Sequence, residues 1–109
     1  MQEPTFLILT ALAARPLHGY GIVQAVSALS DGEVTLRPGT LYGALDRLDQ
    51  QGLVAVDREE PVDGRLRRYY RLSDGGAAAL AEQAGRLRRR AAAADEQLRL
   101  RPGIAGGAA

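Results

Sequence analysis

Apolar residues recur along the chain first with helical spacing and later with the alternation of strands, and the order of these patterns predicts the fold. From Thr5 to Ala14 the residues are apolar on almost every side, so a helix here must be buried on more than one face. In so small a chain we expect a partner chain to supply part of that cover. After Pro16 a second helix is predicted from His18 to Leu29. Its apolar stripe is formed by Ile22, Val23, Val26 and Leu29.

A third helix is predicted after the turn at Ser30–Gly32. Glu33–Leu36 reads as a short extended piece, and Pro38 then stands in the first helical turn, where its missing N–H costs nothing. Gly52 ends the helix, because glycine readily adopts the left-handed conformation that follows a helix. The core face is predicted to carry Leu41, Leu45 and Leu48, and the outer face Thr40, Gly43, Ala44 and Arg47.

Two strand-like runs, Leu53–Arg58 and Leu66–Leu72, follow the third helix. Asp63 and Gly64 between them tolerate the positive φ angles of a tight hairpin turn. Three helices followed by a hairpin is the order of elements in a winged helix-turn-helix. The predicted fold is therefore mostly α-helical with a small β-hairpin wing.

A long last helix is predicted from Ser73, a favourable N-cap, to about Leu100. Its apolar residues follow the three-four spacing of a coiled-coil seam, and about half of them are alanine, so two such helices could approach closely. We expect a homodimer joined by this seam and the first helix. The expected interface residues are Phe6, Leu9, Leu80, Ala84, Leu87, Ala91, Ala94 and Leu98.

These elements divide the chain of 109 residues into three expected parts. Residues 1–72 form the winged helix-turn-helix, residues 73–101 the dimerisation helix, and the Gly/Ala-rich residues 102–109 a disordered tail. A chain of this length has room for one domain with one modest core.

Composition mainly excludes classes of protein. The balance of 46% hydrophobic and 25% charged residues is ordinary for a globular domain, and no apolar run is long enough for a membrane span. Met1–Pro4 place no cationic segment before an apolar one, so we expect no secretory signal and a cytoplasmic, nucleoid-associated location. Without cysteine there is no disulfide or thiolate site.

The net charge of +1 conceals two local clusters of arginine. Arg65, Arg67, Arg68 and Arg71 surround the predicted hairpin, and a DNA backbone responds to such local charge. The second cluster, Arg86–Arg90, lies on the last helix. A solvated helix face is its simpler interpretation, and an ion-pairing or ligand-facing surface is the alternative.

An enzyme finds little support in the sequence. The chain has one histidine, no cysteine and no phosphate-binding Gly-x-x-x-x-Gly-Lys loop. Asp46 and Asp49 are three residues apart, but they lie beside arginine on a predicted exposed face and are expected to serve solubility. A metal site would need ligands besides His18, near which the acidic residues do not cluster. We expect no catalysis, no metal and no cofactor.

Three segments together resemble the PadR family of transcriptional regulators. They are Pro16–Ile22, Leu36–Leu48 with its Pro-Gly-Thr-Leu-Tyr core, and the basic Gly64–Ser73, which contains Tyr-Tyr-Arg-Leu. The resemblance covers roughly residues 7–80. The single short C-terminal helix is similar to the short subfamily, whose members carry one dimerisation helix.

The winged-helix arrangement suggests which residues contact DNA. A recognition helix enters the major groove by its N-terminal turns, where small residues let a phosphate approach. Arg65, Arg67 and Arg68 suit phosphate contact or minor-groove entry from the wing, and the resemblance implies that Tyr20 and Tyr42 contact phosphate or brace the motif. Further contacts are expected from Thr35, Arg37, Gly39, Thr40 and Arg47.

Simpler structural roles compete with several of these assignments. His18 is interpreted first as a cap of the second helix and second as a DNA contact. Tyr42 is interpreted equally as a residue of the core and as a DNA contact. Tyr69 and Tyr70 point to opposite faces of a strand, and Tyr70 is expected to pack inward. The wing arginines could form only a solvated hairpin, although three around one turn favour DNA.

The resemblance implies a homodimer that binds a palindromic operator in double-stranded DNA and represses transcription. It also implies a small-molecule effector that enters near the dimer interface and releases the DNA. The chain has no tryptophan, so an aromatic sandwich for planar compounds is not expected. Phe6, Leu9, Leu80, Ala84 and Leu87 could line a small cavity, although plain interface packing is simpler. The alternative function is a winged-helix protein-interaction module that does not bind DNA.

Overall fold

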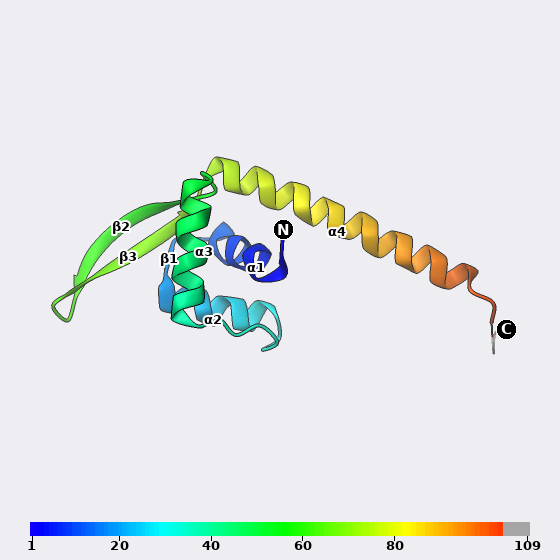
Figure 1. Cartoon of the computed structure of the whole chain (residues 1–109), viewed down its shortest axis with the longest axis horizontal. Helices are drawn as coiled ribbons and strands as arrows, with labels where there is room; N and C mark the ends of the chain where they lie inside the picture. The colour runs from blue at the N-terminus through cyan, green and yellow to red at the C-terminus, as the bar shows by residue number, and fades with distance from the viewer. Residues whose placement is uncertain (104–109) are drawn as a thin grey trace.

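The computed structural model describes residues 1–103, and within them four α-helices and three β-strands form a winged helix-turn-helix with a long C-terminal helix. The elements are α1 (Glu3–Ala13), β1 (Leu17–His18), α2 (Gly19–Leu29), α3 (Pro38–Gln50), β2 (Val54–Val62), β3 (Arg65–Leu72) and α4 (Asp74–Leu100). The β2–β3 hairpin projects from one side of the helical bundle and α4 leaves on the other (Figure 1). Most of the expected tail, residues 104–109, lies outside the described residues.

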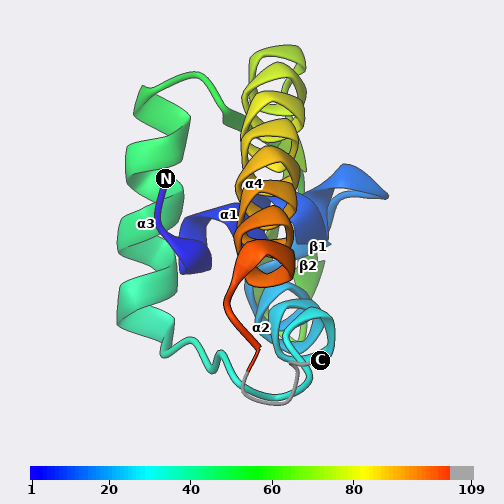
Figure 2. The ribbon, with the colours of Figure 1, turned by 90° about the vertical axis from the view of Figure 1, so that its right-hand side faces the viewer.

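Helix α1 is largely buried by its own chain, so it leaves a partner less apolar surface to cover than the sequence suggested. Leu9 is 0% exposed, and its neighbours Ile8 and Leu12 are also buried. The cover comes from α2, β3 and the first turns of α4, all of which contact α1. In Figure 2 α1 lies behind α4, with α3 on one side. An apolar pattern shows that a helix is enclosed, but it does not show by which element.

Helices α2 and α3 build the rest of the core, with two departures from the sequence pattern. Leu41, Leu45 and Leu48 are buried as predicted. Ala44, which was predicted on the outer face, is buried too. It lies about one helical turn from both Leu41 and Leu48, so it shares their face, and it is small enough to fit. Leu29 at the end of α2 is half exposed and belongs to no core face. The expected extended piece at 33–36 forms no strand.

Gly52 ends α3 as predicted, with a left-handed φ of 76°. The Gly52 N–H donates to the Asp49 carbonyl over 3.0 Å, and the Leu53 N–H donates to the Leu48 carbonyl over 2.9 Å. These two bonds form a Schellman motif, which satisfies carbonyls that a helix end leaves free. The chain therefore leaves α3 in a fixed direction and enters β2.

The three strands pair in the order β1-β3-β2, all antiparallel. The wing hairpin is longer than predicted, because β2 continues through Glu59 and Glu60 to Val62. Asp63 and Gly64 have φ angles of 51° and 79°, which confirms the tight turn. β1 was not predicted, since two residues are too few for a period of two to be visible.

The start of α4 is bonded directly to the loop that follows α3. The Ser73 hydroxyl accepts from the Gly76 N–H at 2.9 Å, as the predicted N-cap, and donates to the Gly52 carbonyl at 2.6 Å. Gly76 is buried, and a Cβ there would collide with the Leu53 carbonyl and lie 2.7 Å from Leu72 Cδ1. These contacts set the direction of α4.

Within residues 1–103, no helix combines the length and apolar character needed to cross a membrane.

Candidate nucleic-acid interface

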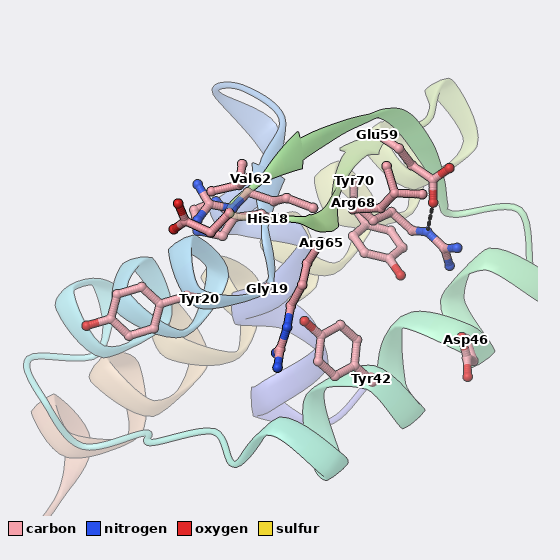
Figure 3. A pocket seen from close by; sticks show the side chains of 13 residues that line it. His18, Gly19, Tyr20, Tyr42, Asp46, Glu59, Val62, Arg65, Arg68 and Tyr70 are labelled. Atoms are coloured by element: carbon pink, nitrogen blue, oxygen red, sulfur yellow. Dashed lines mark hydrogen bonds and ion pairs between the residues drawn. The ribbon is translucent and has the colours of Figure 1, made fainter.

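An open groove of about 890 Å³ separates α3 from the wing. The start of α2 forms its floor and β3 one of its walls (Figure 3). It brings together several residues that the sequence singled out, although they are up to fifty residues apart in the chain. They are His18, Tyr20, Tyr42, Arg65, Arg67 and Arg68.

Tyr42 lies on the groove and is not part of the hydrophobic core. Its side chain is 47% exposed, and its ring stands over the start of α2. A Cβ on residue 19 would lie 2.9 Å from Tyr42 Cζ and closer still to the hydroxyl, so glycine is the residue that fits without displacing the ring. Tyr42 therefore braces α2 against α3 while its hydroxyl stays at the groove. Tyr20, also on α2, is 66% exposed at the rim.

His18 occupies the N-cap position of α2, but among the described residues its side chain makes no capping hydrogen bond. This corrects the first interpretation of His18. Its imidazole instead packs on Tyr69, with 5.4 Å between ring centroids and a tilt of 59°. Burial, and secondarily the nearby charge of Arg67, lowers the pKa of His18, while Glu60 opposes this shift. His18 thus links β1 to Tyr69 in β3, at the end of the wing nearest the helices, which we call the wing root.

Tyr69 is held from a second direction by Arg58. The Arg58 guanidinium lies 3.9 Å from the ring centroid, which is cation–π geometry. Arg58 also donates to Asp57 at 3.0 Å and to Glu60 at 3.3 Å, and these bonds raise its pKa. Hydrogen bonds from Tyr69 and then Arg58 lower the pKa of Glu60. Sequence reasoning missed this cluster, because a bulge between Val56 and Arg58 sets the register.

Tyr70 packs inward, as expected, and is 4% exposed. It alternates with Tyr69 across β3, so one tyrosine enters the core and the other anchors the wing root. Tyr70 pairs in register with Leu17 and with Val56. The two adjacent tyrosines are therefore both structural, on opposite faces of the sheet.

Only part of the charge on the wing arginines is free. Arg68 forms an ion pair with Glu59 at 3.0 Å, and contacts with Tyr70 and Glu59 raise its pKa. Arg65 and Arg67, by contrast, make no ion pair with any residue in the described part of the chain. In Figure 3 the Arg65 side chain extends from the wing into the groove, on the side where Tyr42 lies. The wing arginines without an ion pair in the described residues are thus Arg65, beside the hairpin turn, and Arg67.

The beginning of α3 presents a second set of predicted residues. Thr35, Arg37, Gly39 and Thr40 are all exposed. Arg37 is the N-cap, and within residues 1–103 its side chain does not cap the helix, so the first N–H groups of α3 are left for an outside acceptor. A Cβ at Gly39 would meet no described atom within 4 Å.

Arg47 does not join either set. It lies in the last turn of α3 and lines a separate hollow of about 230 Å³ with Met1, Thr5 and Leu53. Its guanidinium stays near its own helix, 3.6 Å from the position of a Cβ on Gly43. The sequence placed Arg47 and Thr40 on one face by helical spacing alone, but seven residues, about 10 Å, separate them along α3.

The predicted interface residues fall into two groups. Leu9 has no exposed surface to offer a partner, which corrects its place in that set, and Phe6 and Leu80 pack against the core of their own chain. Further along α4 the seam is open: Leu87 is 44% and Leu98 64% exposed. Neither hollow described above, both formed within residues 1–103, includes any member of the expected effector cavity.

Fold and groove together define a winged-helix protein of the kind whose third helix and wing flank one groove. Residues 8–82 match the sequence profile of the transcriptional regulator PadR-like family. The chain belongs to this family of transcriptional regulators.

Two curated relatives show how far the sequence similarity extends. The chain is 43% identical over 75 residues to "Transcriptional regulator Rv3488" of Mycobacterium tuberculosis, covering 69% of this chain and 66% of that protein. It is 36% identical over 58 residues to "Transcriptional regulator YqjI" of Escherichia coli, covering 53% of this chain and 28% of that protein. The chain thus spans just under two thirds of the first relative and less than a third of the second.

Solved structures agree on the fold. A PadR family transcription regulator from Clostridium difficile superposes with a TM-score of 0.73 at 25% identity, covering 87% of this chain and 97% of that one. Bacillus subtilis PadR, solved in complex with operator DNA, gives a TM-score of 0.65 at 21% identity, covering 73% of this chain and 45% of that one. At the latter identity the likeness concerns the fold.

Proposed function

We propose that the chain binds operator DNA as a homodimer and represses transcription. One observation carries this proposal: Arg65 and Arg67, free of ion pairs among the described residues, stand across an open groove from the exposed face of α3. In winged-helix proteins such a helix reads the major groove while the wing follows the adjacent backbone or minor groove.

The proposed contacts are of two kinds: some position the protein on the DNA backbone, and others read the base sequence. Arg37 and the free N–H groups of α3 suit a phosphate, as do the exposed hydroxyls of Tyr20 and Tyr42. Thr40 lies on the first turns of α3, where a side chain reaches base edges. Gly39 leaves open space that would let a DNA strand approach the helix closely.

The relatives support the regulatory part of the proposal. Two are named transcriptional regulators, and the Bacillus subtilis structure contains operator DNA. We propose that a dimer occupies two half-sites and blocks a promoter. A small-molecule effector would act by favouring a dimer in which the two α3 helices no longer match the half-sites, which requires different affinities for the two geometries.

A protein-interaction module is the second candidate, and the acidic residues of the groove favour it. Asp46 on α3 and Glu59 and Asp63 on the wing line the same groove as the arginines. In such a module the groove would hold a peptide of mixed charge. Among the described residues Asp46 and Asp63 form no ion pair, as is also true of Arg65 and Arg67, so charge alone does not decide between the two candidates. DNA binding is preferred because the chain belongs to a family of transcriptional regulators.

A salt-dependent titration tests the proposal. The purified protein is mixed with its own upstream intergenic DNA and with scrambled DNA at two salt concentrations. We expect specific binding that weakens steeply with salt, and a slope of log affinity against log salt that is smaller by about 1.8 in the double variant Arg65→Ala/Arg67→Ala.

The matched control is the double variant Arg88→Ala/Arg89→Ala, which removes two exposed arginines from α4, far from the groove. It should bind DNA like the wild type. An equal loss in both variants would mean that net charge alone acts. No binding to either DNA by a folded wild-type protein would move the assignment to the protein-interaction module.

A further inference from the structure

The one histidine of the chain, His18, lines the groove between α3 and the wing (Figure 3). Its side chain is half-buried, and within residues 1–103 it forms no side-chain hydrogen bond and no ion pair. The imidazole instead keeps its place by packing on the ring of Tyr69. Its nitrogens are therefore available to a partner that enters the groove.

Charged groups face His18 from the neighbouring elements. On β3, Arg67 is two residues from Tyr69 and so lies on the same face of the strand, and its charge acts on His18. On β2, the acid that acts on His18 is Glu60, the register partner of Arg67. Helix α2 has no charged side chain, but the positive end of its dipole lies at His18. The same groove is also lined by Asp46, Glu59, Asp63, Arg65 and Arg68.

In the protein alone, a protonated His18 has no free counter-charge. Glu60 is already engaged by Arg58, which donates to it over 3.3 Å, and by Tyr69. Arg67 forms no ion pair in the described part of the chain, so an imidazolium would lie near an unpaired guanidinium. Burial and the charge of Arg67 accordingly lower the pKa of His18. At neutral pH His18 is therefore uncharged in the free protein.

We propose that a DNA phosphate binds between His18 and Arg67, and that His18 takes up one proton from the solvent as the phosphate binds. The inference rests on the DNA binding of the proposed function and adds its regulation by pH. The phosphate supplies the negative charge that the site lacks, so it offsets the repulsion between the two cations. The ring of Tyr69 tolerates the new charge, because a cation over an aromatic face is favourable.

The direction of the pH effect follows from the proton uptake. Because the phosphate raises the pKa of His18, the complex holds more protons than the separate protein and DNA, and affinity rises as the pH falls between the free and bound pKa values. One proton for each half-site limits the gain to about tenfold per pH unit. Carboxylates titrate at about pH 4, and the pKa of Glu60 is lowered further, so the acids of the groove stay charged above pH 5.5.

The first test measures affinity for the upstream intergenic DNA at pH 7.5 and 5.5 and constant salt, by fluorescence anisotropy. The wild type should bind each half-site about three- to tenfold more tightly at pH 5.5. His18→Gln cannot become charged and should bind with nearly the same affinity at both pH values. Arg65→Ala is the matched control, because it should lose salt dependence but keep the pH dependence of the wild type. Circular dichroism at both pH values establishes that each variant is folded.

The second test reads the pKa of His18 by NMR, since an untagged chain gives one histidine signal. This pKa should lie below about 6.5 in the free protein and about one pH unit or more higher with DNA. Arg67→Ala should raise the pKa of the free protein and reduce the rise caused by DNA.

The outcomes separate this inference from the proposed function. DNA binding whose pH dependence is the same in the wild type and His18→Gln would overturn the inference alone. A His18 pKa that bound DNA leaves unchanged would do the same. No DNA binding at any pH by the folded wild type would overturn both.

Discussion

The phenol of Tyr42, on α3, occupies the space that a Cβ on residue 19, at the start of α2, would need, so any larger residue there must displace the ring. Replacing Gly19 by alanine should destabilise the fold by about 1 kcal/mol, at the lower end of the cost of overpacking, because the half-exposed ring can move aside. Thermal unfolding measures the change. The double variant Gly19→Ala/Tyr42→Ala should recover part of the loss, because the clashing ring is gone.

Gly39→Ala is the matched control for that experiment. Its Cβ would point into open space among the described residues, and alanine is the better helix former by up to about 1 kcal/mol. We expect stability to be unchanged or higher, while DNA affinity falls if Gly39 admits a DNA strand. Equal destabilisation by Gly19→Ala and Gly39→Ala would contradict the Tyr42 contact.

A second prediction concerns the buried Gly76. Gly76→Ala forces a methyl group against the Leu53 carbonyl, which belongs to the backbone and cannot rotate away. The expected loss is about 2–3 kcal/mol, at the upper end of overpacking. Gly85→Ala, in the same helix, meets only the flexible ends of Arg88 and Arg89 and should be neutral or stabilising.

The two hydrogen bonds of Ser73 can be separated by substitution. Ser73→Ala removes the N-cap and the bond to Gly52 and should cost about 1–2 kcal/mol. Ser73→Thr keeps both bonds and should stay near the wild type. Ser73→Asp keeps the cap but cannot donate to the Gly52 carbonyl, so an intermediate stability in urea unfolding is expected. If Asp and Thr were equal, the bond to Gly52 would contribute nothing.

His18 predicts how stability depends on pH. Burial lowers its folded pKa below the unfolded value of about 6.5, so below that value the unfolded chain holds more protons than the folded one. The contribution of His18 is complete above the unfolded pKa and is lost as the pH falls through the interval beneath it. Urea unfolding between pH 7.5 and 5.5 should show this loss in the wild type and a flatter profile in His18→Gln. Parallel profiles would refute it.

Removing the negative charge of Glu59 should increase the affinity for DNA. Glu59→Gln would release Arg68 from its ion pair and remove a negative charge from the groove. If the groove meets phosphate, affinity should rise at low salt and the salt slope should grow by about 0.9, as expected for one more neutralised phosphate. Asp31→Asn, which removes one charge in the turn after α2, is the control. Equal gains in both variants would show a net-charge effect only.

Local signals in the sequence were sufficient for most of the fold. Gly52, the Asp63–Gly64 turn and Ser73 each act on their nearest neighbours, so they set the ends of elements regardless of tertiary context. The spacing of the leucines in α3 likewise predicted which face of that helix is buried.

The misses concern relations between distant segments. The sequence shows that α1 is enclosed, but not that the enclosing elements are α2, β3 and α4 of the same chain, and so Leu9 was assigned to the interface. The Tyr69 cluster depends on a bulge that changes which residue of β2 faces it. In the groove, the sequence supplied the arginines, but the neutralisation of Arg68 by Glu59 depends on cross-strand register.

The rigid attachment of α4 has a consequence for how spacing on DNA would be read. Because Ser73, Gly52 and Gly76 leave no flexible linker, α4 and the bundle should rotate together as a lever arm. A helix of 27 residues is about 40 Å long. For two arms that cross at the far end of α4, a tilt of about 5° would then displace each recognition helix by about 3.5 Å, close to one base-pair step. The crossing angle of two alanine-rich helices would thus set the operator length that the dimer accepts.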